Sequence, residues 1–72
     1  MYFVVQKKHG AGGWDSGVVT KDSEGEAMHQ FHAFLSTYAY GQSDALDYVA
    51  CSVETDDGRT VRSEIDDRRT GA

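Results

Sequence analysis

Residues 24–40 form the longest segment with a helical pattern, and this segment limits the fold more than any other feature. Ser23 and Glu26 match a capping box, in which each side chain bonds a backbone N–H at the start of a helix. The chain contains no proline, and Gly41 is suited to end the helix as its C-cap. We therefore expect one long helix, whose apolar side must be covered by the rest of the chain.

At about 100° per residue, the apolar side chains of this segment fall on one arc of the helix. His32 lies at the border of the arc, whereas His29 and Tyr40 fall on the opposite side. We expect the arc to pack against a sheet and to supply the helical half of the core. Its members are Ala27, Met28, Phe31, Phe34, Leu35 and Tyr38.

Two segments before the helix have the composition of strands. Residues 2–8 (YFVVQKK) begin with β-branched and aromatic side chains. Residues 14–21 (WDSGVVTK) form the second strand, in which Gly17 is expected to mark a bulge. The glycine-rich stretch between them (HGAGG) predicts a long, mobile hairpin tip.

Two segments after the helix alternate between apolar and polar side chains, as half-buried strands do. They are residues 48–55 (YVACSVET) and 60–65 (TVRSEI), with the sequence DDG between them. A three-residue loop over 56–58, with Gly58 in the left-handed conformation, keeps the apolar faces together. The expected pairs are Val53 with Val61 and Val49 with Ile65 on the inner face, and Glu54 with Thr60, Ser52 with Arg62 and Ala50 with Glu64 on a polar outer face.

The order of these elements predicts an α+β fold of the type β-β-α-β-β. In this fold a four-stranded antiparallel sheet is covered on one face by the single helix. The order of the strands within the sheet stays open. The 72 residues suffice for one small domain, and its charged tail, residues 66–72, is expected to fray.

The net charge of −5, from twelve acidic and seven basic side chains, disfavours direct nucleic-acid binding. The basic runs are the pairs Lys7-Lys8 and Arg68-Arg69, and neither alternates with aromatic residues. The apolar start of the sequence is too short for a signal peptide or a membrane span, so we expect a cytoplasmic protein without membrane contact. The acidity favours instead a protein partner with a basic surface.

His29 and His32 form an HxxH pair on the expected helix, where two imidazoles can share a metal ion. Cys51 is the third candidate ligand, but the alternation of its strand directs it into the core, where a cysteine acts as a small hydrophobic residue. A closed metal site needs four ligands, and the sequence has no phosphate-binding loop. Cys51 and His32 could form a nucleophilic pair if the helix crosses the strand at that point, but a buried cysteine on a strand is far more often a small hydrophobic residue. We therefore predict no metal, no cofactor and no enzymatic activity.

Aromatic side chains outside the apolar arc are candidates for protein binding, because Trp and Tyr often anchor interfaces. Tyr38, Tyr40 and Tyr48 are expected to form one contiguous patch. The full set of interface candidates is Trp14, His29, His32, Tyr40, Tyr48, Asp44, Asp47, Asp56 and Asp57, with Asp66 and Asp67 adding acidic charge.

The stretch QFHAFLSTYAYG, followed by DYVACSVETDDG, resembles short uncharacterised accessory proteins encoded by phages and integrated mobile elements of gut Firmicutes. The resemblance extends over residues 2–69 and implies no catalytic motif or cofactor. It implies a small accessory protein of a mobile element. Small acidic α+β proteins of that kind include inhibitors of host defence such as anti-CRISPR proteins, which occlude the basic nucleic-acid-binding surface of an enzyme.

The sequence thus favours a non-enzymatic protein-binding module, in its sharpest form an inhibitor of a host nucleic-acid-processing or defence enzyme. Two alternatives stay open. One is a small metal- or thiol-dependent domain that uses His29, His32 and Cys51. The other is a homodimeric structural domain, in which dimerisation would account for exposed aromatic side chains.

Overall fold

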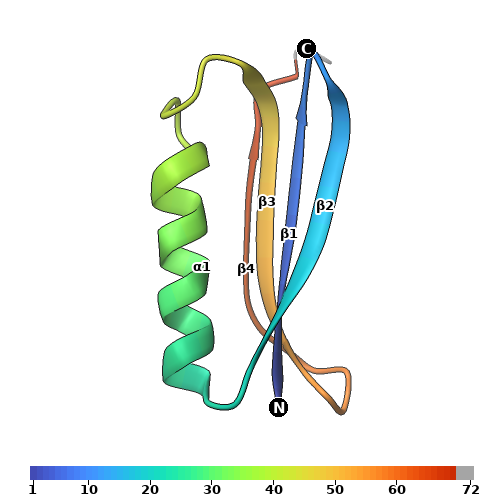
Figure 1. The fold of residues 1–72 in the computed structure, drawn as a ribbon, viewed down its shortest axis with the longest axis vertical. Helices are drawn as coiled ribbons and strands as arrows, with labels where there is room; N and C mark the ends of the chain where they lie inside the picture. Colours follow the sequence, from blue (N-terminus) through green and yellow to red (C-terminus); the bar gives the residue numbers. More distant parts are fainter. Residues whose placement is uncertain (70–72) are drawn as a thin grey trace.

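The computed structural model describes residues 1–69, and its elements follow the predicted order. All four strands join one antiparallel sheet, and the helix covers one face of it (Figure 1). The predicted α+β fold is confirmed. The elements are strands β1 (Tyr2–Gly10) and β2 (Gly13–Lys21), helix α1 (Glu24–Tyr38), and strands β3 (Leu46–Thr55) and β4 (Thr60–Asp67).

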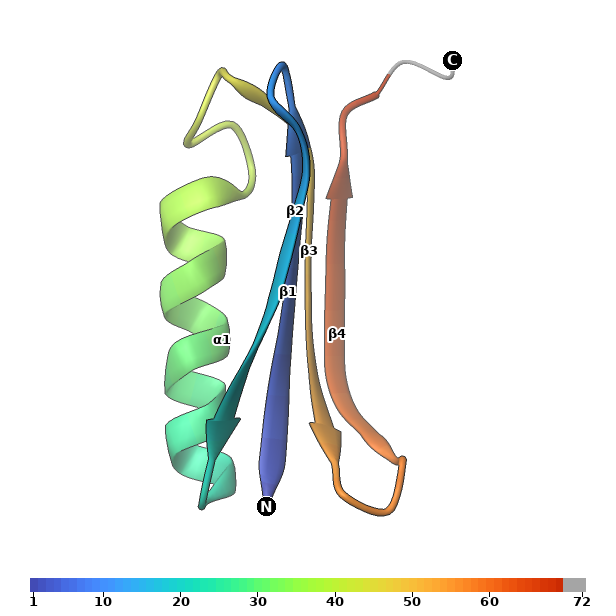
Figure 2. The ribbon, with the colours of Figure 1, turned by 45° about the vertical axis from the view of Figure 1, so that its right-hand side comes forward.

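The strands lie in the order β2-β1-β3-β4, so β1 and β3 occupy the centre of the sheet. β1 pairs with β2 on one side and with β3 on the other. α1 packs mainly over β3 and β1. Figure 2 shows that, within residues 1–69, no second layer covers the opposite face of the sheet. The sheet therefore has one buried and one uncovered face.

The core lies between α1 and the two central strands. Val4 of β1 and Val49 and Val53 of β3 are fully buried under the helix. Cys51 is buried beside them, as its strand alternation predicts. The predicted arc of α1 is also confirmed, with Ala27, Phe31, Phe34 and Leu35 buried and Met28 and Tyr38 packed at the edge of the core.

α1 starts at the predicted position, but only one of the two predicted capping bonds forms, because the Glu26 carboxylate bonds the Ser23 hydroxyl and not its backbone N–H. The helix ends earlier than predicted. The Glu26 backbone N–H donates to Ser23 Oγ at 3.2 Å, and the Ser23 hydroxyl donates to the Glu26 carboxylate at 3.0 Å. α1 ends at Tyr38 rather than Tyr40. The C-cap is the extended residue Ala39 and not the predicted Gly41. Tyr40 and Gly41 follow in left-handed conformations, with φ of 56° and 83°.

The first hairpin is tighter than predicted. β1 continues to Gly10, which pairs with Gly13 and leaves a two-residue turn, residues 11–12, in place of a long tip. The expected bulge at Gly17 is wrong, because the ladder between β1 and β2 is unbroken. Glycine at position 10 has a steric reason, since a Cβ there would collide with the carbonyl oxygen of Ala45.

The second hairpin has the predicted three-residue turn. The Thr55 N–H donates to the Arg59 carbonyl at 2.8 Å, and the Gly58 N–H donates to the Thr55 carbonyl at 3.0 Å. Gly58 has a φ of 88°, which is the left-handed conformation expected for this type of loop. Glu54 pairs with Thr60, also as predicted.

A bulge in β4 then overturns the predicted faces of that strand. Val53 lies opposite Arg62 instead of Val61, so Val61 is an extra residue in the ladder. Because successive side chains of a strand point to opposite faces, one extra residue exchanges the faces beyond it. The predicted pairing of Val49 with Ile65 is therefore wrong, and Ile65 is 58% exposed on the uncovered face of the sheet.

The bulge also turns three charged side chains of β4 toward the helix side of the sheet. Arg62, Glu64 and Asp66 pair there with buried positions of β3. The predicted outer pairs of Ser52 with Arg62 and Ala50 with Glu64 are wrong for the same reason. Water can reach these charges because β4 is an edge strand over which α1 does not pack directly, although Arg62 reaches to 5.9 Å from the centroid of the Phe31 ring.

The last strand extends further toward the C-terminus than predicted. Asp66 and Asp67 complete β4, and the Arg68 N–H donates to the Asp47 carbonyl at 2.7 Å. The first part of the segment expected to fray thus belongs to the sheet. Residues 70–72 lie outside the described residues.

Replacing Phe31 with alanine should remove a large part of the core packing. Phe31 is 1% exposed. Truncation of a buried phenylalanine costs about 3–5 kcal/mol, comparable to the total stability expected at about 0.05–0.15 kcal/mol per residue. We expect the Phe31→Ala protein to be largely unfolded without denaturant, as measured by far-UV circular dichroism. The exposed His29→Ala control should shift the free energy of unfolding by no more than about 0.5 kcal/mol, and a stable Phe31→Ala protein would contradict the assigned core.

Candidate functional site

The face of the sheet that α1 leaves uncovered, here called the open face, carries the side chains that alternate with the buried ones. Cross-strand pairing arranges them in four rows that start at the turn of the first hairpin. These rows contain more apolar side chains than the polar outer face that the sequence predicts. Row by row, they are Trp14, His9, Tyr48 and Asp67; Ser16, Lys7, Ala50 and Ile65; Val18, Val5, Ser52 and Ser63; and Thr20, Phe3, Glu54 and Thr60.

The first row forms an aromatic cluster with Arg69, which follows β4. The centroid of the Trp14 ring lies 4.7 Å from that of His9 and 5.2 Å from that of Tyr48. The Arg69 guanidinium lies 4.6 Å from the Tyr48 ring centroid and 5.4 Å from the Trp14 ring centroid. These cation–π contacts hold the end of the described chain against the sheet. The aromatic cluster is therefore His9, Trp14, Tyr48 and Arg69.

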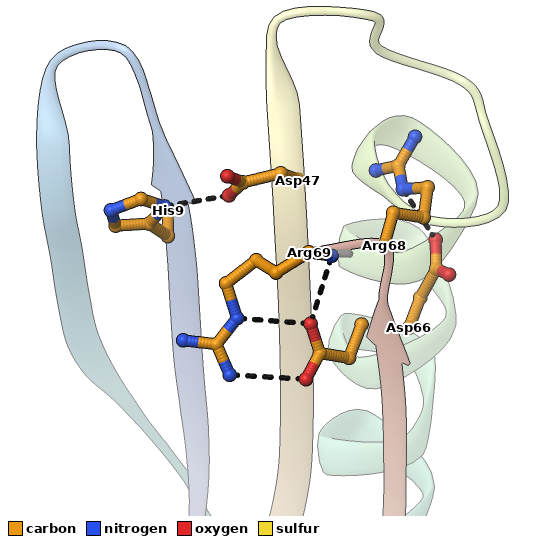
Figure 3. A network of polar contacts seen from close by, with 6 residues as sticks. His9, Asp47, Asp66, Arg68 and Arg69 are labelled. Carbon is orange, nitrogen blue, oxygen red and sulfur yellow. Dashed lines mark hydrogen bonds and ion pairs between the residues drawn. The ribbon is translucent and has the colours of Figure 1, made fainter. Parts of the chain in front are cut away.

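Two carboxylates fix His9 and Arg69 of the cluster (Figure 3). Asp67 accepts two hydrogen bonds from the Arg69 guanidinium, at 2.9 Å from Nε and 3.0 Å from Nη2. This pairing lowers the pKa of Asp67 and raises the pKa of Arg69. His9 Nδ1 lies 2.6 Å from Asp47 Oδ1. Asp47, an interface candidate from the sequence, is thus engaged in a contact within the protein.

The structure does not bring the candidate metal ligands together. His29 and His32 are exposed on α1, and the ring of His32 lies edge-on to Phe31 at 5.3 Å between centroids. Cys51 lies under the helix, where burial raises the pKa of its thiol to about 11. Within residues 1–69, no group of three or more His, Cys, Asp or Glu side chains is placed to hold a metal ion.

The three tyrosines expected in one patch lie in three different places. Tyr38 is half-buried, with Lys8 Nζ 4.2 Å from its ring centroid. Tyr40 is 59% exposed on the helix side of β4, where its backbone N–H donates to an Asp66 carboxylate oxygen at 2.5 Å. Tyr48 belongs to the aromatic cluster on the open face. The predicted patch is therefore not formed.

Exposed carboxylates gather at the end of the molecule opposite the aromatic cluster. The start of α1 and the turn between β3 and β4 both lie at this end (Figures 1 and 2). Lys21 and Arg59 add two basic side chains there, so the acidic groups predominate. Asp44, by contrast, is exposed in the loop before β3. The acidic end is defined by Asp22, Glu24, Glu26, Asp56 and Asp57.

Sequence reasoning named Asp56 and Asp57 but missed the other members of the acidic end. The order of elements does contain the signal, because β2 and β3 run antiparallel to α1 and bring the helix start to the same end as the second hairpin turn. His9 was also missed, although a two-residue first turn sets it opposite Trp14. Arg69 has no such signal, since it follows the last strand.

A groove of about 370 Å³ runs between α1 and the edge strand β2. The groove is open beside Gly17, where a Cβ would have no atom within 4 Å. Lys8, which lines the groove, lies 3.5 Å from an Asp15 carboxylate oxygen and also faces the ring of Tyr38. The charge of Lys8 is therefore already satisfied within the protein.

Asp57 should contribute a pH-dependent part of the stability of the second hairpin turn. The Thr55 hydroxyl donates to its carboxylate, and this hydrogen bond lowers the pKa of Asp57 below the ordinary value of 3.8. A depressed pKa in the folded state stabilises the fold above the unfolded pKa of about 3.9, and the stabilisation is lost as the pH falls through the folded pKa. Urea titrations should find Asp57→Asn less stable than the parent protein at neutral pH, with a difference that shrinks in acid. Asp44→Asn is the control, and a difference that does not change with pH would contradict the assignment.

Cys51 should react with thiol reagents only when the protein unfolds. Cys51 is 1% exposed, and the thiol pKa of about 11 leaves little thiolate at pH 8. We expect the rate of reaction with Ellman's reagent to be slow in buffer and to rise steeply across the urea transition. A Ser36→Cys variant, which adds a thiol at an exposed helix position, should react at once with one equivalent. Rapid reaction of the parent protein would show that the strand position of Cys51 is accessible.

Comparison with protein-family models, curated proteins and solved structures found no match. In the part of the chain that the structure describes, no helix has the length and apolar character needed to cross a membrane.

Proposed function

We propose that this chain is a non-enzymatic protein-binding module that presents its acidic end to a basic surface of another protein. The observation that carries the proposal is the gathering of five exposed carboxylates at one end of the molecule. Two elements far apart in the sequence supply them, the start of α1 and the turn between β3 and β4. Charges of one sign on a folded surface speed association with an oppositely charged partner and orient it.

Three of these carboxylates are available to a partner. Glu26 is bonded to Ser23 at the helix cap, and Asp57 accepts the Thr55 hydroxyl. The carboxylates of Asp22 and Glu24 form no hydrogen bond or ion pair within residues 1–69. Asp56 has one weak ion pair, at 3.8 Å from the amino group of Met1. The two bonded carboxylates hold the local backbone in place, and the other three supply charge for binding.

The charge favours a partner that normally holds nucleic acid. Nucleic-acid-binding proteins hold phosphate groups with clusters of Lys and Arg. The acidic end of this chain can occupy such a cluster in place of the phosphates. In its sharpest form, the proposal is a phage or mobile-element inhibitor of a host nucleic-acid-processing or defence enzyme. The net charge of −5 supports this form. Trp14 and Tyr48, which the sequence suggested as anchors of the same contact, lie at the other end and belong to a different surface.

Affinity capture with a charge variant should test this function. The Asp22→Asn/Asp56→Asn protein loses two of the three available carboxylates of the acidic end and keeps both bonded ones. We expect the parent protein to recover basic nucleic-acid-processing proteins from a lysate of its native host, and the variant to recover several-fold less of them. Raising the salt concentration to about 0.5 M should have the same effect, because it screens exposed charges.

The matched control is Asp15→Asn/Asp44→Asn, which removes the same number of charges from exposed positions outside the acidic end. It should recover as much partner as the parent protein. Equal losses in both variants would show that overall charge, and not the acidic end, governs binding. Recovery that ignores both salt and the acidic-end variant would also contradict the proposal.

A further inference from the structure

The open face exposes apolar side chains over much of its length. Val18 is 59% exposed, Ile65 is 58% exposed and Trp14 is 55% exposed. Phe3 and Val5 lie on the same face and are only half-buried. A sheet face that stays in contact with water is usually polar. A contiguous apolar surface of this kind marks an interaction site.

The open face is also electrically balanced, in contrast to the rest of the molecule. Lys7 and Arg69 carry its positive charges, and Glu54 and Asp67 carry its negative charges. The whole net charge of −5 therefore resides on other surfaces. Two copies of an acidic protein repel each other, and this repulsion is smallest where the surfaces that meet are neutral.

The size of the open face suits a dimer interface. The Cα atoms extend over 35 × 20 × 20 Å, which gives the sheet a face of roughly 700 Å². A standard interface buries about 800 Å² on each partner. Near the centre of the face, Ala50, Ser52 and Ser63 line a hollow of about 150 Å³ that can receive side chains from a second sheet.

We propose that the open face binds a second copy of this chain, sheet against sheet, with the strands of the two copies running in opposite directions. This two-fold arrangement sets the aromatic-cluster end of each copy over the acidic end of the other. Lys7 and Arg69 of one copy then approach Glu54 of its partner, so opposite charges meet at both ends of the interface.

The opposite orientation, with strands parallel, is disfavoured by charge. It places the two acidic ends side by side, where ten carboxylates would repel one another, five from each copy. In the proposed orientation the acidic ends point away from each other and stay exposed. Dimerisation uses different residues from the proposed binding function, so each proposal can fail without the other.

Sedimentation equilibrium on the isolated protein tests the dimer. We expect a dimer at micromolar concentrations, and at least a tenfold rise in its dissociation constant in Val18→Lys/Ile65→Lys, which puts charge at two apolar positions of the face. The control His29→Lys/Ala33→Lys adds lysines at exposed positions of α1 and should dimerise like the parent. Val18→Thr/Ile65→Thr keeps β-branched side chains, which favour strands. The threonine variant should also weaken the dimer, and it keeps the test valid if the lysine variant fails to fold.

Two results would overturn the dimer. One is a parent protein that remains monomeric up to about 1 mM, a concentration at which even weak association is visible. The other is a control that weakens association as much as the open-face variants do. If the protein is a monomer, the open face would instead bind a different protein.

Spin labels at Asp56→Cys test the orientation by electron–electron distance measurement in the dimer. Cys51 is buried and stays unlabelled in the native protein. Antiparallel strands place the two labels at opposite ends, at a separation near or above the 35 Å length of one molecule. A separation much shorter than this length would overturn the proposed orientation.

Discussion

The packing of one helical stripe on two central strands is the interaction on which the rest of the structure depends. Phe31 is almost completely buried against a floor that includes Val4, Val49 and Val53. α1 is the one helix within residues 1–69, so its apolar stripe can cover only one face of the sheet. The apolar stripe of α1 is only wide enough to cover the central strands, so the inner side of the edge strand β4 need not be apolar. β4 is an edge strand over which α1 does not pack directly, and charged side chains on its inner side can remain hydrated there.

Much of this fold follows from local pattern, and the parts that do not are those that depend on pairing across strands. The helix start at Ser23 and the turn at Gly58 each follow from a few neighbouring residues, and the structure confirms both. The strand order and the extra residue at Val61 have no local signature, because they depend on how two strands fit together. Alternation alone placed Ile65 in the core, and the bulge placed it outside.

The two candidate surfaces differ in how far the sequence could predict them. Trp14 and Tyr48 were identified one by one as exposed aromatic residues, but their contact depends on the order of β2, β1 and β3. Arg69 joins them only because β4 continues beyond its predicted end. The acidic end follows more directly, since an antiparallel path brings the helix start and the last hairpin turn to the same end. Residue type indicates a candidate, and topology decides its neighbours.

The bulge at Val61 has a consequence for how such a protein can evolve. Deleting Val61 would leave the faces of β4 as they are, because Val61 is the residue without a partner and Arg62 would still lie opposite Val53. Straightening the bulge with Val61 kept in the ladder would instead exchange the two faces beyond it, turning Ile65 toward the helix side and Arg62 and Glu64 outward. The core between α1, β1 and β3 would keep every one of its side chains. A substitution that favours the straight strand would thus replace apolar surface with charged surface while the sequence that specifies the fold stays almost the same.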